Sequence, residues 1–198
     1  SLLQLHCAYG VKLSKPMELA DAAQRVILEH HEFCDGTGYP SGLKGPQISP
    51  LTRVVCIANQ YDNLCNPSNL AEALTPHEAL SRMFAQQRTR FDEVALKAFI
   101  RCLGVYPPGS IVTLSNEAIG LVMSVNPTKP LRPWVKVYDD AVPKDEAILL
   151  NLERETDIII AKALRPALLP PAVYAYLSPR QRVTYYFDSS AQAGQGPE

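Results

Sequence analysis

Two adjacent histidines, His30 and His31, are followed directly by the sequence Glu-Phe-Cys-Asp-Gly-Thr-Gly-Tyr-Pro. Imidazole nitrogens bind several divalent first-row metals. Neighbouring residues of a helix point about 100° apart, so we expect the pair to serve two sides of a polynuclear cluster instead of chelating one ion. The alternative is a pair of histidines at a helix C-terminus that interact with the helix dipole. The loop that follows the pair favours the metal site.

That loop contains residues that set its backbone conformation at defined positions. Gly36 and Gly38 can adopt backbone angles closed to other residues, and Pro40 fixes the exit from the loop. The side chain of Asp35 can accept hydrogen bonds from the backbone that follows it, as in an Asx turn. We therefore expect a preshaped loop that presents Tyr39 as a stacking platform for a nucleobase. The alternative is a helix C-cap with a packed tyrosine.

Four further polar residues lie where they can be weighed as members of this site or as ordinary structural or surface residues. Asn59 and Asp62 lie one turn apart on a predicted helix, where they close a site with the histidines or form the polar flank of a core helix. His6 lies on the first predicted helix and by itself indicates only a packed or surface histidine. His77 stands at the start of a capped helix, and we expect it to be solvated.

The composition is that of an ordinary globular protein, with 198 residues, 46% hydrophobic and 20% charged residues, and a net charge of −1. This balance favours neither a nucleic-acid polymer nor a membrane surface as partner. No apolar run approaches the roughly 20 residues that span a bilayer, and we expect a cytoplasmic protein. The five cysteines form no Cys-x-x-Cys pair, which indicates small core residues of a reduced protein. Cys34, inside the loop motif, also suits a ligand or a reactive role.

The first 103 residues carry the patterns of about five helices. Leu5, Tyr9 and Leu13 recur at helical spacing and predict a buried stripe on the first helix. Pro16 is expected to open the second helix, whose apolar face continues into the histidine pair. Start and end signals of the later helices are Ser49-Pro50, Thr75-Pro76-His77-Glu78, Phe91-Asp92 and Gly104.

After Gly104 the pattern changes to short strands separated by turns. Strands are predicted at 111–114, 118–125, 134–138 and 147–152. Short helices are predicted at 158–164 and from Ser178-Pro179 through Tyr186. The predicted fold is therefore mainly α, a helical bundle followed by a small antiparallel β-containing C-terminal extension. We divide the chain into a helical domain at 1–103, a β-rich extension at 104–188 and a flexible tail at 189–198.

Residues His30 to Pro40 match the signature His-His-Glu-x-x-Asp-Gly-x-Gly-Tyr-Pro at every fixed position, and the chain therefore resembles the HD-GYP family. These are bacterial phosphodiesterases of the HD superfamily that hydrolyse cyclic di-GMP. The resemblance covers roughly residues 1–103 and implies the C-terminal part of an HD-GYP-type helical domain. Its further matches are His6 to Gly10, Leu43 to Ile48, Arg53 to Leu64 and Phe91-Asp92.

The resemblance also implies roles for individual residues. It places a divalent metal cluster, with iron or manganese favoured and zinc or nickel as alternatives, on His6, His30, His31 and the position of Asn59. Tyr39 and Asp62 correspond to residues near the substrate. The loop-shaping residues are Asp35, Gly36, Gly38 and Pro40.

Three departures from the family pattern bear on activity. The His-Asp pair that names the superfamily lies upstream of the first histidine helix in the family and does not occur in this sequence. We therefore expect this sequence to be part of a longer protein. A metal-ligating aspartate is replaced by Asn59, which removes one negative charge, so the cluster can be incomplete or absent. The basic residues expected to grip substrate phosphates are replaced by Ser68, Ala71 and Glu72. Each lost charge-assisted contact weakens binding by about 1.5–3 kcal/mol.

These observations predict a metal-dependent cyclic di-GMP phosphodiesterase, degenerate and with weak or no activity. The alternative is a non-catalytic signalling module that uses the Tyr39 loop to dock a partner, such as a diguanylate cyclase domain. A third hypothesis is hydrolysis of another phosphorylated ligand. A homodimer is a further candidate assembly.

Overall fold

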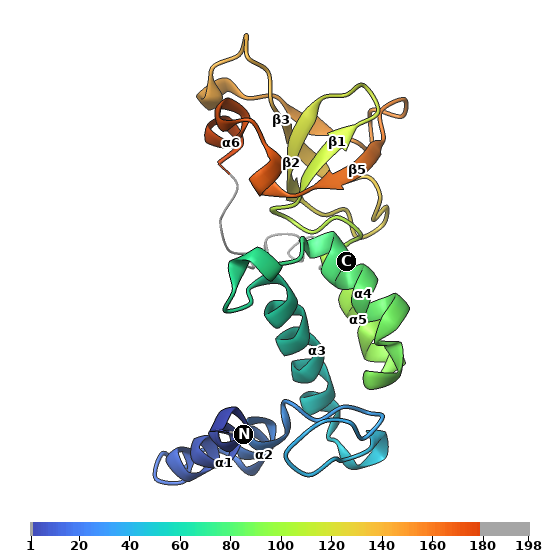
Figure 1. Ribbon diagram of the computed structural model, residues 1–198. Helices are drawn as coiled ribbons and strands as arrows, with labels where there is room; N and C mark the ends of the chain where they lie inside the picture. Colours follow the sequence, from blue (N-terminus) through green and yellow to red (C-terminus); the bar gives the residue numbers. More distant parts are fainter. Residues whose placement is uncertain (1, 179–198) are drawn as a thin grey trace, which may run out of the picture.

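The computed structural model describes residues 2–178, in which helices come first and a sheet second (Figure 1). The helices are α1 (Leu2–Ser14), α2 (Asp21–Glu29), α3 (Pro50–Cys65), α4 (Pro76–Gln86), α5 (Glu93–Leu103) and α6 (Pro171–Leu177). The strands are β1 (Ile111–Leu114), β2 (Ile119–Ser124), β3 (Trp134–Val137), β4 (Leu149–Asn151) and β5 (Ile160–Leu164). The fold is therefore mainly helical with a small β extension, as the sequence predicts.

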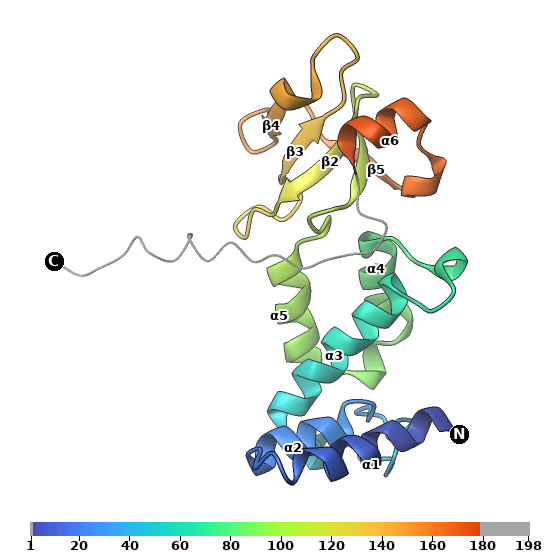
Figure 2. The same cartoon turned by 90° about the vertical axis from the view of Figure 1, so that its left-hand side faces the viewer.

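The helices α1 and α2 lie at one end of the molecule and the sheet at the other, with α3, α4 and α5 between them (Figures 1 and 2). The predicted helix starts of this middle bundle are confirmed. Each first turn is capped by a side-chain oxygen that accepts a backbone N–H three residues ahead, which satisfies an otherwise unpaired donor. The caps are Ser49 for α3, Thr75 with its capping-box partner Glu78 for α4, and Asp92 for α5.

The core of the helical part lies between α3, α4 and α5. One buried line along α3, formed by Ile57, Tyr61 and Cys65, packs against residues of the other two helices. The members from α4 and α5 and the turn between them are Ala79, Leu80, Met83, Phe91, Leu96 and Leu103. This core fixes the direction of α3, and α3 carries Asn59 towards the histidine pair.

Two predictions for the first helices are wrong. The helix α2 begins at Asp21, and Pro16 lies in the turn before it. The predicted buried stripe of α1 is exposed, with 61% of Tyr9 and 69% of Leu13 open to solvent. The reason is that α1 meets α2 through Gly10, where a Cβ would lie 2.6 Å from Cγ2 of Ile27. Small residues allow the helices to approach closely, so the interface turns away from the large apolar side chains.

The sheet is antiparallel with the order β4-β3-β2-β1-β5. Adjacent residues of β1 face opposite sides: Ile111 packs with Val173 and Leu177 of α6, and Val112 belongs to the other buried cluster. The predicted helix at 158–164 is instead β5, because Ile160–Leu164 pair along the outer edge of β1. Helical propensity there is overridden by the strand pairing that β1 offers. Ser178, the expected cap of a last helix, is instead the C-cap of α6, and the rest of that predicted helix and the tail at 189–198 fall on residues outside the described part.

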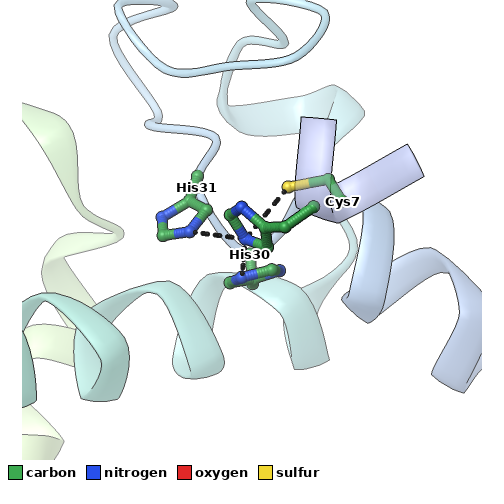
Figure 3. Close-up of side chains that lie close together, drawn as sticks. Cys7, His30 and His31 are labelled. Atoms are coloured by element: carbon green, nitrogen blue, oxygen red, sulfur yellow. Dashed lines mark hydrogen bonds between the residues drawn. The ribbon is translucent and has the colours of Figure 1, made fainter. Parts of the chain in front are cut away.

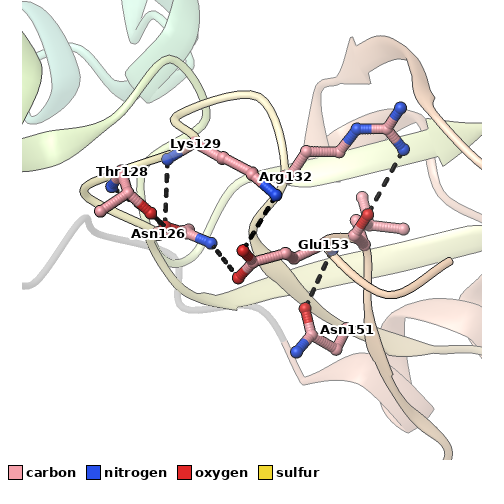
Figure 4. Close-up of polar contacts among 7 residues, drawn as sticks. Asn126, Thr128, Lys129, Arg132, Asn151 and Glu153 are labelled. Carbon is pink, nitrogen blue, oxygen red and sulfur yellow. Dashed lines mark hydrogen bonds and ion pairs between the residues drawn. The ribbon is translucent and has the colours of Figure 1, made fainter. Parts of the chain in front are cut away.

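Polar side chains hold the loops at one end of the sheet (Figure 4). The carboxylate of Glu153 accepts a hydrogen bond from Asn126 Nδ2 at 2.7 Å and pairs with Lys129 Nζ at 3.1 Å. The guanidinium of Arg132 donates to the carbonyl oxygen of Ile158 at 2.7 Å. These contacts fasten the β2–β3 loop to the segment between β4 and β5.

The helical part and the sheet are in direct contact. His77 Nδ1 lies 2.9 Å from the carbonyl oxygen of Val105, and its ring stacks on Tyr106 with centroids 4.9 Å apart. The prediction of a solvated His77 is therefore wrong, since its ring is partly buried at this junction. Arg165 adds an ion pair with Glu78 at 3.1 Å. Among the helices described, none has the length and apolar character needed to cross a membrane.

Candidate metal centre

The histidine pair converges on one point because α2 ends before it. Glu29 is the last residue of α2, His30 is its C-cap with φ −67° and ψ −5°, and His31 lies in the turn that follows. His30 Nε2 and His31 Nε2 each lie 3.1 Å from Nε2 of His6 on α1. The 100° separation of neighbouring side chains applies only within a continuous helix, so both rings can turn their Nε2 atoms towards His6.

A fourth ligand-type atom lies at the same point. Sγ of Cys7 is 3.5 Å from His6 Nε2, and the donor atoms of His6, Cys7, His30 and His31 all lie within 4.8 Å of one another (Figure 3). Cys7 is fully buried, whereas His6 is exposed. Cys7 is buried as expected of a core cysteine, and Cys34, the cysteine expected to suit a ligand role, is not a member of this group.

The distances between the ring nitrogens fit a divalent ion. Imidazole nitrogens bind zinc at about 2.0–2.1 Å, so two ligands at angles of 90° to 110° stand about 3.0–3.4 Å apart. Both contacts of His6 Nε2 fall in that range. A neutral ring nitrogen carries either a proton or a lone pair, so His6 Nε2 cannot donate to one histidine and accept from the other. A cation at this point would accept the Nε2 lone pairs of all three rings.

Hydrogen bonds on the far side of two rings set their orientation. His30 Nδ1 lies 2.9 Å from the carbonyl oxygen of Ile27, which can only accept, so Nδ1 carries the proton and Nε2 is the ligand atom. His31 Nδ1 lies 3.1 Å from the side-chain amide nitrogen of Asn59, and in that arrangement Nδ1 accepts and Nε2 carries the proton. A half-turn of the Asn59 amide would bring its oxygen to Nδ1 to accept the proton there and would free the Nε2 lone pair for a metal. Asn59 thus contacts the Nδ1 side of the His31 ring. Burial, and then the neighbouring His30 and His6, lower the pKa of His31 to about 4.

The aromatic ring of Tyr39 lies against this group. It stacks on the His31 ring with centroids 4.6 Å apart and an interplanar angle of 24°. The backbone N–H of Tyr39 donates to the carbonyl oxygen of His31 at 3.1 Å, so the loop returns to the residue from which it started. The predicted position of Tyr39 beside the histidines is thus observed.

Comparisons with known proteins relate this chain to a family and to several enzymes. Residues 1–94 match the HD domain family, and residues 111–170 match a KOW domain associated with the HD domain. A cyclic di-GMP phosphodiesterase of Pseudomonas aeruginosa is 34% identical over 139 residues, which cover 68% of this chain and 33% of the relative. The cyclic di-GMP phosphodiesterase response regulator RpfG of Xanthomonas campestris is 38% identical over 76 residues, 38% of this chain and 20% of the relative.

The chain belongs to the HD-GYP family. A 3'3'-cGAMP-specific phosphodiesterase of Vibrio cholerae is also similar, with 30% identity over 105 residues, 53% of this chain and 23% of the relative. The chain spans between about a fifth and a third of the length of these three relatives.

The loop of the HD-GYP domain has the predicted shape. Asp35 Oδ1 accepts hydrogen bonds from the Thr37 backbone N–H at 2.9 Å and from its hydroxyl at 2.6 Å, which confirms the Asx turn. Gly36 has φ +80°, in the region that favours glycine. A Cβ on Gly38 would lie 2.4 Å from the backbone nitrogen of Phe33, so this position admits no side chain. The Tyr39–Pro40 peptide bond is cis.

Glu32 is a residue of the HD-GYP loop that the sequence analysis did not single out. It is 1% exposed, and its two carboxylate oxygens accept the backbone N–H groups of Ser41 at 2.6 Å and Leu43 at 2.9 Å. It thus anchors the far side of the loop to the turn that carries His31. The sequence feature that could have indicated the role of Glu32 is its fixed position in the signature, directly after the histidine pair.

Asp62 lies one turn beyond Asn59 on α3 and is not a member of the four-residue group. Its Oδ1 accepts a hydrogen bond from Asn66 on the same helix at 2.8 Å. Where basic residues are expected from the family pattern, Glu72 accepts a hydrogen bond from Asn69 at 2.8 Å. The structure therefore brings together His6, His30, His31 and Tyr39, with Asn59 behind them.

Proposed function

We propose that this chain carries the metal centre of a cyclic-dinucleotide phosphodiesterase of the HD-GYP type, and that its turnover of cyclic di-GMP is weak or lost. The observation that supports the centre is the convergence of His6, His30 and His31 on one point, with Nε2 contacts of 3.1 Å. A bound ion would supply an activated water and polarise phosphoryl oxygens. The names of the relatives give cyclic di-GMP as the first substrate to test and 3'3'-cGAMP as the second.

The chain's own residues would hold and orient such a site in defined ways. The carbonyl oxygen of Ile27 keeps Nε2 of His30 unprotonated and directed at the centre. The stacked ring of Tyr39 covers one side of His31 and offers an aromatic surface beside the ligand atoms. A nucleobase stacking there would gain about 1–3 kcal/mol, which would position the phosphodiester without contributing charge.

Weak turnover is proposed because two charged features of the family pattern are replaced. Asn59 contributes no negative charge, so hard cations such as manganese are bound less strongly than by an aspartate. The stretch from Ser68 to Glu72 contributes no cation for substrate phosphates, and Glu72 adds a negative charge. Two lost phosphate contacts at about 1.5–3 kcal/mol each would weaken binding by two to four powers of ten.

A non-catalytic docking module is the second candidate function, and the anchoring of the loop favours it. The Tyr39 loop is held by Glu32 and by the close packing of Gly38, without help from a substrate. Pro40 and Ser41 are exposed on that loop and available to a partner. The partners we propose to test are a diguanylate cyclase domain and a second copy of this chain. We propose that this interaction takes place in the cytoplasm.

The test measures metal content and turnover of cyclic di-GMP and 3'3'-cGAMP by the full chain, beside Asn59→Asp. The matched control is Asn63→Asp, which adds the same charge to an exposed position of α3. We expect metal in the wild type, little turnover, and an increase in Asn59→Asp alone. Fast turnover by the wild type would contradict degeneracy, and no turnover in either protein would favour the docking module.

A further inference from the structure

A groove runs between α4 and α5 and ends at the junction with the sheet. Its volume is about 430 Å³, which lies within the range of small-molecule binding sites. Leu80 and Phe84 line it from α4 and Ile100 from α5, while Val105 and Pro130 close it at the sheet end. Three segments of the chain therefore enclose this space, which is more than the exposed face of one helix.

Contacts at the junction fix the closed end of the groove. His77 Nδ1 lies 2.9 Å from the carbonyl oxygen of Val105, which can only accept, so Nδ1 donates its proton there. The His77 ring also stacks on Tyr106. Gly104 ends α5 with φ +74°, and a Cβ on it would lie 2.9 Å from Cγ1 of Val125. The groove is thus formed by the fold itself, and a ligand does not have to open it.

The walls of the groove favour an aliphatic ligand. Leu80 and Ile100 also contact the core shared with α3, so they form the floor, and Phe84 stands at the open end with 44% of its surface exposed. From His77 to Phe84 the groove follows about 10 Å of α4. A nucleotide or a sugar would bury polar groups against these walls without partners, which is unfavourable. An extended hydrocarbon chain suits both their length and their chemistry.

The charges at the rim are positive. Lys97 and Arg101 line the groove, and no carboxylate does. Lys97 Nζ pairs with Glu93 at 2.8 Å, so its charge is already compensated. Arg101 is exposed, and among the described residues no carboxylate lies within ion-pair distance of its guanidinium. A guanidinium can hold a carboxylate through two parallel N–H···O bonds, and here it stands beside an apolar groove.

We propose that this groove binds one aliphatic monocarboxylate, with its carboxylate on Arg101 and its chain over Leu80, Ile100 and Phe84. The chain contacts Pro130 as well as the helices, so binding stabilises the junction of the helical part with the sheet. The helices α1 and α2, beside the histidine centre, lie at the end of the molecule opposite to the sheet (Figures 1 and 2). The inference is therefore independent of metal binding and of hydrolysis.

The test titrates the full wild-type chain with sodium decanoate below the concentration at which decanoate forms micelles. Nuclear magnetic resonance measures the affinity and the intermolecular contacts. We expect saturable one-to-one binding, with nuclear Overhauser effects from the decanoate chain to Phe84 and Ile100. Across hexanoate, octanoate and decanoate the affinity should rise about two- to fourfold per methylene until the groove is filled. The uncharged 1-decanol should bind about three- to tenfold more weakly than decanoate.

Three variants separate the carboxylate contact from general electrostatic attraction. Arg101→Gln should bind decanoate about three- to tenfold more weakly and leave the affinity for 1-decanol unchanged. Arg82→Gln is the matched control, because it removes the same charge from an exposed position of α4 that does not line this groove, and it should change neither affinity. Phe84→Ala should weaken the binding of both ligands.

The remaining outcomes would overturn the inference. These are the absence of saturable binding, Overhauser effects to another part of the chain, and equal affinities for decanoate and 1-decanol. Binding to phosphatidylglycerol vesicles without binding of monomeric decanoate would also overturn it, since a membrane surface would then be the ligand. The contacts are measured on the wild type, so poor folding of a variant does not affect them. Decanoate binding by metal-stripped chain without turnover would support this site even where the proposed hydrolysis fails.

Discussion

The side-chain amide of Asn59 lies 3.1 Å from Nδ1 of His31, on the side of the ring opposite to the group of ligand atoms. A carboxylate in this place would accept the Nδ1 proton strongly, fix the tautomer and make Nε2 more basic. We predict that Asn59→Asp binds zinc about 10- to 100-fold more tightly than the wild type. Competition with a chromophoric chelator measures the change. Asn63→Asp, on the exposed side of α3, should leave the affinity unchanged.

The carboxylate of Glu32 is the central anchor of the loop, because it accepts the N–H groups of Ser41 and Leu43 while 1% exposed. Glu32→Gln keeps the volume but replaces one acceptor oxygen by a donor that faces another donor. We predict a loss of about 1.5–3 kcal/mol in the free energy of unfolding of the helical part. Chemical denaturation followed by circular dichroism measures it. A variant as stable as the wild type would show that the loop does not depend on this carboxylate.

The capping signals of the middle helices could be read from the sequence, because a cap is a local contact. Ser49, Thr75 and Asp92 each accept a backbone N–H within three residues, and all three were predicted correctly. The Asx turn at Asp35 was predictable for the same reason. The pairing of strands depends on residues far apart in the sequence and could not be predicted in the same way. Residues 158–164 have the pattern of a helix, and Ile160–Leu164 form a strand because they pair with the edge of β1.

The sequence predicted three histidines that the structure brings together, but not the way in which they meet. The sequence indicates His6, His30 and His31 through the family resemblance, yet helical periodicity alone suggested that the histidine pair diverges. The pair converges because α2 ends at Glu29, and helix ends are the least certain feature of a periodic pattern. Cys7 was missed because a single cysteine next to a histidine is ordinarily a core residue.

Gly38 packs against the backbone of the turn that carries the histidines. A Cβ there would lie 2.4 Å from Phe33 N and 2.5 Å from the carbonyl oxygen of His31, and backbone cannot yield as a flexible side chain does. We predict that Gly38→Ala destabilises the helical part by about 1–3 kcal/mol and weakens metal binding. Gly45→Ala is the control, since its Cβ would meet Cys34 at an ordinary 3.7 Å.

The two readouts for Gly38→Ala report on different parts of the chain. Far-ultraviolet circular dichroism follows mainly the helices, whereas Trp134, the single tryptophan, lies in β3. We expect the loss in the circular dichroism transition and in chelator competition. Equal stability and metal affinity for Gly38→Ala and Gly45→Ala would contradict the close packing of the loop.

Asp92 links α5 to α3 and makes the stability of the helical part depend on pH. The backbone N–H of Ala95 and, against the effect of burial, the guanidinium of Arg53 lower the pKa of Asp92 below 3.8. Its ion pair with Arg53 has a length of 3.1 Å. Asp92→Asn keeps a good helix cap and removes the charge, so we predict a loss of about 0.5–1 kcal/mol at neutral pH.

The sign of the pH dependence follows from the lowered pKa. Well above pH 3.8, the ordinary pKa of the group, the carboxylate is ionised in both folded and unfolded chains, and its full contribution to stability is present. As the pH falls through the folded pKa, the folded state takes up the proton and the contribution disappears. Denaturation curves of wild type and Asp92→Asn should therefore differ at pH 7 and converge once the pH lies below the lowered pKa of Asp92 in the folded chain. The exposed Asp157→Asn should change neither curve, and a difference between wild type and Asp92→Asn that persists in acid would show that the ion pair is not its cause.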